Sequence, residues 1–142
     1  MVVSGGDAEC FLRFSMELIG IVRNIVEIGI GLLFLVGAIF NASYTLRHGE
    51  EFYGSFAASA WFRPARKLVR SVVIPHAQLF TTLLIVLQTS IAIMILSRGS
   101  LVEAGLIAGA AFSLAAVPVS NVPGAIANFA LAAILALLVF TR

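Results

Sequence analysis

Four long segments of this chain are almost free of charge, and this feature restricts the fold more than any other. The segments cover residues 19–44, 75–97, 101–117 and 123–140. A helix needs about 20 mainly apolar residues to cross a membrane. In lipid, every backbone N–H and C=O group must be bonded within the protein, and a helix achieves this within one segment. The sequence therefore predicts an all-α protein, an integral membrane four-helix bundle in a single membrane domain over residues 1–142.

The composition supports a lipid environment. Of the 142 residues, 61% are hydrophobic and 11% are charged, whereas a soluble domain carries about 25% charged residues. A soluble core of this size could not hide so much apolar surface from water. The formal net charge of +2 gives no argument for nucleic acid as a partner. The single cysteine, Cys10, excludes chemistry that needs paired or clustered cysteines.

The connection between the first two segments, residues 49–73, is predicted to be interfacial. After Pro64, apolar residues fall on one side of a short helix and basic residues on the other. Such a helix lies in the membrane interface, and Trp61 is placed as an aromatic anchor. The residues expected to contact lipid head groups are Trp61, Arg63, Arg66, Lys67 and Arg70. Plain anchoring is one interpretation; a lid over a site, or a clamp for anionic lipid, is the other.

We expect a multi-pass protein of the cell (plasma) membrane. Because the number of spanning helices is even, both termini should lie on the same side. Basic residues normally mark the cytoplasmic side. Here they divide almost equally between the two sides, so the rule does not assign an orientation. The terminal side carries Arg13, Arg23, Arg98 and Arg142, and the opposite side carries Arg47, Arg63, Arg66, Lys67 and Arg70.

Polar side chains within the apolar segments are the candidate site residues, because such groups are costly in hydrocarbon. On the first helix, Arg23 and Asn41 are eighteen residues apart, which is five full turns and places them on one face. Glu27 lies about 40° away on the same count. Alternatively, Arg23 and Glu27 pair only with each other near the interface.

The second helix carries a polar stripe that is expected to face the bundle interior. Gln88 lies near the middle of this span and needs hydrogen-bond partners. The stripe consists of Gln78, Thr82, Ile85 and Thr89, with Thr81 and Gln88 beside it. The candidates for contact with a quinone, a lipid or the interior are Arg23, Glu27, Asn41, Gln78, Gln88 and Asn128. Hydrogen bonding between helices is the alternative role for the second-helix residues.

Small residues mark positions of close helix packing. Gly105 and Gly109 form a G-x-x-x-G pattern that Ser113 extends. Such patterns let two membrane helices approach closely. We expect this pattern to pack within the bundle of one chain rather than to form a dimer interface.

The sequence has none of the common catalytic motifs. It contains no P-loop, no G-x-S-x-G and no H-E-x-x-H, so neither a hydrolytic nor a phosphoryl-transfer enzyme is supported. His48 and His76 lie at segment boundaries and are not expected to hold a haem within this chain. We therefore predict no catalytic residue, no metal site and no covalently bound cofactor.

Three stretches of the chain carry a resemblance to a known family. They are Arg23 with the glycine-rich run from Gly29 to Gly37, the loop His48-Gly49-Glu50-Glu51-Phe52-Tyr53-Gly54-Ser55-Phe56, and Val73-Ile74-Pro75 at the second helix. With these residues the layout resembles the DoxX/DoxD-like family of small four-helix membrane proteins. The resemblance covers most of the chain, and its motifs are degenerate. Members of that family often carry a lysine where this chain has Asn41 and a glutamate where it has Gln88.

The resemblance implies membership of redox machinery, because some members of that family are subunits of quinone-linked oxidoreductases such as thiosulfate:quinone oxidoreductase. The expected function is a small membrane subunit of a redox or respiratory complex, an anchor or part of a quinone pocket, with other redox subunits as partners. One alternative is a homodimeric proton-coupled transporter that uses Glu27. The other is a structural assembly protein without a ligand.

Overall fold

The computed structural model describes residues 5–142, with side chains from residue 8 onward, and this part of the chain is helical without strands. Its four long helices are α1 (Gly5–Phe40), α4 (Ala77–Leu96), α5 (Ser100–Ala116) and α6 (Val122–Phe140). Each belongs to a helical stretch that is long and apolar enough to cross a membrane. The predicted all-α architecture with four apolar helices is therefore confirmed.

The long helices pack in chain order, α1 against α4, α4 against α5 and α5 against α6. Pro123 lies in the first turn of α6, where its missing N–H is not needed. The Asn121 side chain caps the same helix by accepting a hydrogen bond of 2.8 Å from the Gly124 N–H. The core consists mainly of Ile30, Phe34, Ile91, Ile95, Leu106 and Leu135.

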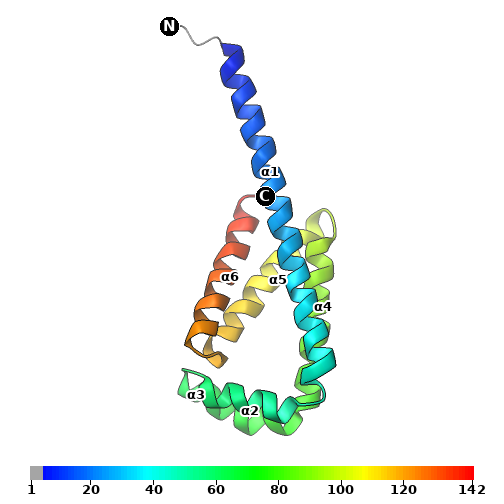
Figure 1. The fold of residues 1–142 in the computed structure, drawn as a ribbon, viewed down its shortest axis with the longest axis vertical. Coiled ribbons are helices and arrows are strands. Elements are labelled where there is room, and N and C mark those ends of the chain that lie inside the picture. The colour runs from blue at the N-terminus through cyan, green and yellow to red at the C-terminus, as the bar shows by residue number, and fades with distance from the viewer. Residues whose placement is uncertain (1–4) are drawn as a thin grey trace.

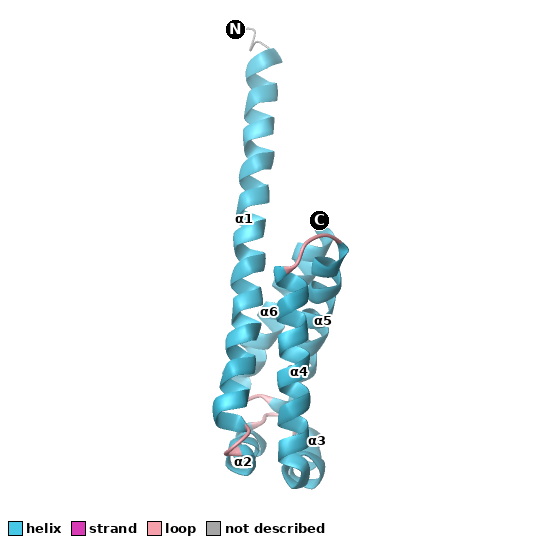
Figure 2. Ribbon diagram, turned by 90° about the vertical axis from the view of Figure 1, so that its right-hand side faces the viewer, coloured by secondary structure: helices cyan, strands magenta, loops and turns pink. Residues whose placement is uncertain are grey.

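Two short helices cross one end of the bundle. They are α2 (Gly49–Ser59) and α3 (Arg63–Leu68). Both run across the long helices in Figure 1 and are seen nearly end-on in Figure 2. We call this part the crossing layer. Residues 49–73 thus fold into two short helices followed by a π-helical turn, Val69–Val73. Their location in a membrane interface stays a prediction.

The chain turns into and out of the crossing layer at two matching corners. His48 and His76 have almost the same non-helical backbone angles, with φ of −120° and −121°. The residues that follow them, Gly49 and Ala77, touch: a Cβ atom on Gly49 would lie 2.9 Å from the Ala77 Cβ. Glycine at this position therefore lets the two corners meet and fixes the layer against the bundle.

The G-x-x-x-G pattern of α5 packs inside the same chain. A Cβ atom on Gly105 would lie 2.8 Å from the backbone nitrogen of Ile95 in α4. A Cβ on Gly109 would lie 3.2 Å from the ring of Phe34 in α1. Ser113, the third position, is fully buried. The predicted packing within one chain is confirmed.

We predict that Gly105→Ala destabilises the bundle by about 1–3 kcal/mol, because the added methyl group meets backbone and not a flexible side chain. The matched control is Gly29→Ala, since a Cβ at Gly29 meets nothing within 4 Å. Unfolding of both variants in detergent micelles measures the difference. Equal stability of the two variants would contradict this account of α4–α5 packing.

Candidate functional site

A cavity of about 840 Å³ lies between the crossing layer and the bundle. Its wall is mainly apolar, and the crossing layer, α4, α5 and α6 all contribute to it. Five aromatic side chains line it: Phe52, Tyr53, Phe56, Phe80 and Phe112. Small-molecule sites in proteins commonly have this size and this apolar character with a few polar groups. We call it the inner cavity.

The polar groups of the inner cavity include two residues that the sequence singled out. Asn41, in the π-helical turn Asn41–Thr45 after α1, is buried. Its Nδ2 atom donates a hydrogen bond of 2.7 Å to Oε1 of Gln88 on α4. Both residues line the cavity. The structure therefore joins two amides that are 47 positions apart in the sequence into one polar contact.

The Gln88 amide is held in place by its surroundings. A Cβ atom on Gly37 would lie 3.0 Å from Gln88 Nε2, so the glycine leaves room for this side chain beside α1. Within residues 8–142, Gln88 Oε1 accepts from Asn41, and no hydrogen bond from Gln88 Nε2 is present. This NH₂ group therefore has no acceptor among the described residues.

Asn128 of α6 also lines this cavity. Its Nδ2 atom donates to the Gly124 carbonyl at 2.9 Å and to Ser120 Oγ at 3.3 Å. These contacts orient the side chain and leave its carbonyl oxygen as an acceptor. Asn41, Gln88 and Asn128, all predicted as interior contacts, thus line one cavity.

Tyr53 and Thr81 attach the crossing layer to α4, and their contact could not be predicted from the sequence. Both are buried, and their hydroxyl oxygens lie 3.0 Å apart. Thr81 already donates its proton to the Ala77 carbonyl at 2.8 Å, so the Tyr53 hydroxyl is the donor in this pair. Burial raises the pKa of Tyr53. The phenol is therefore neutral at physiological pH.

Arg23 and Glu27 belong to a different cluster, at the opposite end of the bundle. Glu27 is buried, and its Oε1 lies 3.0 Å from Arg142 Nε and 3.8 Å from Arg23 Nε. Arg23 also donates to the Thr141 carbonyl at 3.1 Å, and Arg142 donates to the Gly99 carbonyl at 3.3 Å. This ion cluster joins α1 to the end of α6 and to the turn between α4 and α5. The predicted Arg23–Glu27 pair is present, but the closer partner, Arg142, was missed.

The predicted polar stripe on α4 is wrong at one end. Gln78 and Thr82 are exposed on the outer surface, and the interior face runs instead through Ala77, Thr81 and Gln88. The predicted stripe passes through Gln78, one position after the inward-facing Ala77, and one position along a helix rotates a side chain by 100°. The position of Ala77 is fixed by its contact with Gly49, which lies far away in the sequence.

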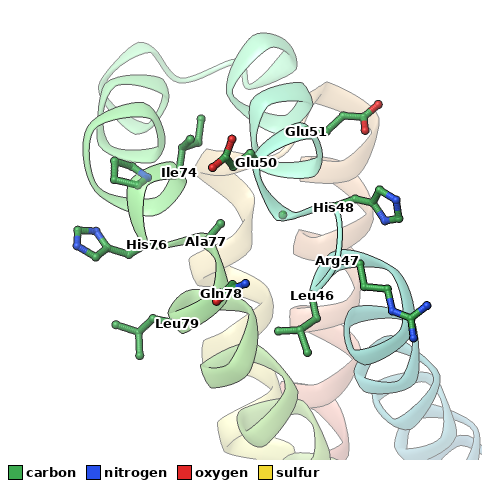
Figure 3. A pocket seen from close by; sticks show the side chains of 12 residues that line it. Leu46, Arg47, His48, Glu50, Glu51, Ile74, His76, Ala77, Gln78 and Leu79 are labelled. Atoms are coloured by element: carbon green, nitrogen blue, oxygen red, sulfur yellow. The ribbon is translucent and has the colours of Figure 1, made fainter.

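Gln78 borders a second, polar cleft of about 640 Å³ between the two corners of the chain. In Figure 3, Glu50 points toward its middle, whereas His48 and His76 point outward on opposite sides. The Nδ1 atoms of these histidines bond to carbonyls of their own helical turns, Tyr44 O and Val72 O. The two imidazoles therefore do not converge on one ligand. Among the described residues, no three His, Cys, Asp or Glu side chains form a group that could hold a metal ion.

The predicted lipid-contact residues differ in exposure. Arg63, Lys67 and Arg70 are exposed. Arg66 is only partly exposed, and its Nε donates to the Ala60 carbonyl at the end of α2. Trp61 donates through Nε1 to the Val117 carbonyl at 3.0 Å and keeps half of its surface exposed. Arg66 and Trp61 thus also hold the crossing layer together and attach it to the α5–α6 connection.

Comparisons of this chain with models of protein families, with curated proteins and with solved structures give no match.

We predict that Arg142→Gln lowers the stability of the bundle by about 1–2 kcal/mol, because Glu27 loses its closest cation while remaining buried. Arg98→Gln is the control, since Arg98 is exposed in the neighbouring turn. Thermal unfolding in detergent compares the two variants. The double variant Glu27→Gln/Arg142→Gln should lose less stability than the sum of the losses in the two single variants. Strictly additive losses would contradict a direct Glu27–Arg142 interaction.

Proposed function

We propose that this chain is a membrane subunit that binds a quinone-type ligand in the inner cavity as part of a larger redox or respiratory complex. The single observation that carries the proposal is an apolar, aromatic-lined cavity next to the Asn41–Gln88 amide pair. A quinone matches this arrangement because it combines a flat ring, polar carbonyl oxygens and an apolar tail. The resemblance to the DoxX/DoxD-like family points in the same direction.

The residues of the cavity suit binding and orientation. Gln88 Nε2 is placed to donate to a ligand carbonyl, and the aromatic side chains offer ring faces for stacking. Amides and hydroxyls do not themselves exchange electrons with a quinone. A partner subunit with its own cofactor would supply that chemistry, which is why we propose a subunit role and not a self-contained enzyme.

We also propose that the crossing layer lies at the membrane surface and contacts anionic lipid head groups. Arg63, Lys67 and Arg70 are exposed on it, and clustered basic side chains attract anionic lipids. In this arrangement both termini lie on the other side of the bilayer. The membrane that we propose is the cell (plasma) membrane. The inner cavity then opens near the level of the lipid head groups, where a quinone head group would enter.

The transporter alternative gains no support from Glu27. A proton-coupling carboxylate needs access to substrate and water, and Glu27 is buried in ion pairs with Arg142 and Arg23. It also lies at the end of the bundle away from the inner cavity. The structural alternative remains distinct, because it predicts that the cavity residues matter for stability alone.

We predict that Gln88→Leu weakens quinone binding about tenfold, the equivalent of one hydrogen bond to the ligand. The control is Thr82→Val, a change of similar size on the exposed face of the same helix. Binding of a short-chain ubiquinone to the purified protein, followed by tryptophan or ligand fluorescence, measures the affinity. Unchanged affinity of a Gln88→Leu protein that folds normally would sink the proposed ligand site.

The subunit role has a separate test. Gentle extraction of the tagged protein from its native membrane, followed by mass spectrometry, should recover cofactor-bearing redox subunits in fixed ratio together with extractable quinone. Recovery of the chain without any redox subunit would overturn the subunit role and leave the ligand site to be judged by the Gln88→Leu measurement.

A further inference from the structure

The N-terminal half of α1 projects beyond the rest of the bundle, as Figures 1 and 2 show. The contacts of Arg23 with Thr141 and of Glu27 with Arg142 mark the level at which α6 ends. The helix continues past that level for about 27 Å, from Val22 to Gly5, at 1.5 Å per residue. We call residues 5–22 the projecting segment.

The projecting segment has almost no cover from the chain that carries it. Between residues 8 and 22 no side chain is buried, and only Ser15 and Gly20 are partly covered. Eight large apolar side chains are at least half exposed there: Phe11, Leu12, Phe14, Met16, Leu18, Ile19, Ile21 and Val22. Exposed apolar surface of this extent marks contact with lipid or with another protein.

The apolar side chains follow a heptad pattern. Spacings of three and four residues alternate along one seam, which consists of Phe11, Phe14, Leu18, Ile21, Ile25 and Ile28. Glu9 and Arg13 lie away from the seam, whereas Glu17 and Asn24 flank it at the position where coiled coils often carry polar side chains. Three heptads with an apolar seam are typical of a helix that packs along a second, similar helix.

The seam faces away from the bundle. Leu18 and Glu27 are nine residues apart, which is a rotation of about 180° around the helix, and Glu27 lies on the bundle side. Ile25 and Ile28, the last seam positions, are exposed. A second helix can therefore approach the whole seam without meeting α4 or α6.

A second copy of this chain meets the requirements of the seam. When two copies insert in the same direction, their projecting segments run parallel at the same depth, with identical residues at the same level. All six seam positions are apolar, so no like charges meet at a two-fold axis. Two-fold pairs with self-complementary surfaces are the commonest closed assemblies.

From these observations we propose that the projecting segment is the interface between two copies of this chain, paired as a parallel two-stranded coiled coil along the seam from Phe11 to Ile28. The pair would place the two inner cavities on the outside of the assembly, because each bundle lies behind its own α1. This pairing is independent of the ligand in the inner cavity.

Cysteine cross-linking in native membranes tests the pairing. Cys10 is first replaced by serine, since it is exposed within the segment. Leu18→Cys then places a thiol on the seam, and Met16→Cys is the matched control. Met16 is an apolar residue of similar exposure on the far side of the same turn. Oxidation should link Leu18→Cys chains about ten times faster than Met16→Cys chains, because a disulfide needs Cα atoms about 4.4–6.8 Å apart.

Phe14→Cys, a second seam position, repeats the test if Leu18→Cys fails to fold. Light scattering of the unmodified protein in mild detergent should give the mass of two chains. Equal linking of seam and control positions would overturn the proposal, and so would linking of the seam to a protein of another mass. The proposal would also be overturned if neither seam cysteine forms a cross-link although both react freely with a soluble maleimide.

Discussion

The high cost of polar groups in lipid governs where this chain places most of its polar side chains. The long helices present apolar side chains outward, and these surfaces are compatible with lipid. Helical hydrogen bonding satisfies the backbone, and short side chains such as Ser90 and Thr82 donate back to carbonyls of their own helix. The larger polar side chains cannot do this, so most of them gather where the helices leave space for a partner.

Two such places lie at opposite ends of the bundle, and they differ in chemistry. At one end Glu27, Arg23 and Arg142 form a charged cluster that joins α1, the end of α6 and the α4–α5 turn. At the other end, neutral amides and a neutral phenol face the inner cavity or its edge. The charged cluster holds the helices together. The neutral groups at the other end surround the inner cavity and leave it open.

Much of this arrangement was predictable because it depends on local patterns. Apolar length predicted the four long helices, and the G-x-x-x-G spacing predicted that α5 packs closely. Five full turns between Arg23 and Asn41 placed both on the face of α1 that meets the bundle. The remaining features depend on contacts between distant residues. Arg142 meets Glu27 across 115 positions, and no pattern around either residue signals it. Likewise, the inward position of Ala77, and hence the outward position of Gln78, follows from contact with Gly49.

Photoaffinity labelling in native membranes tests most directly whether the inner cavity binds a quinone-type ligand, as we propose. An azidoquinone would be activated by light, and the labelled peptides would be mapped by mass spectrometry. The account predicts label on side chains around the cavity, on α2, α4 and the start of α6, with loss of the label when excess natural quinone is added. Label confined to the outer faces of the long helices, or label that natural quinone does not displace, would contradict it.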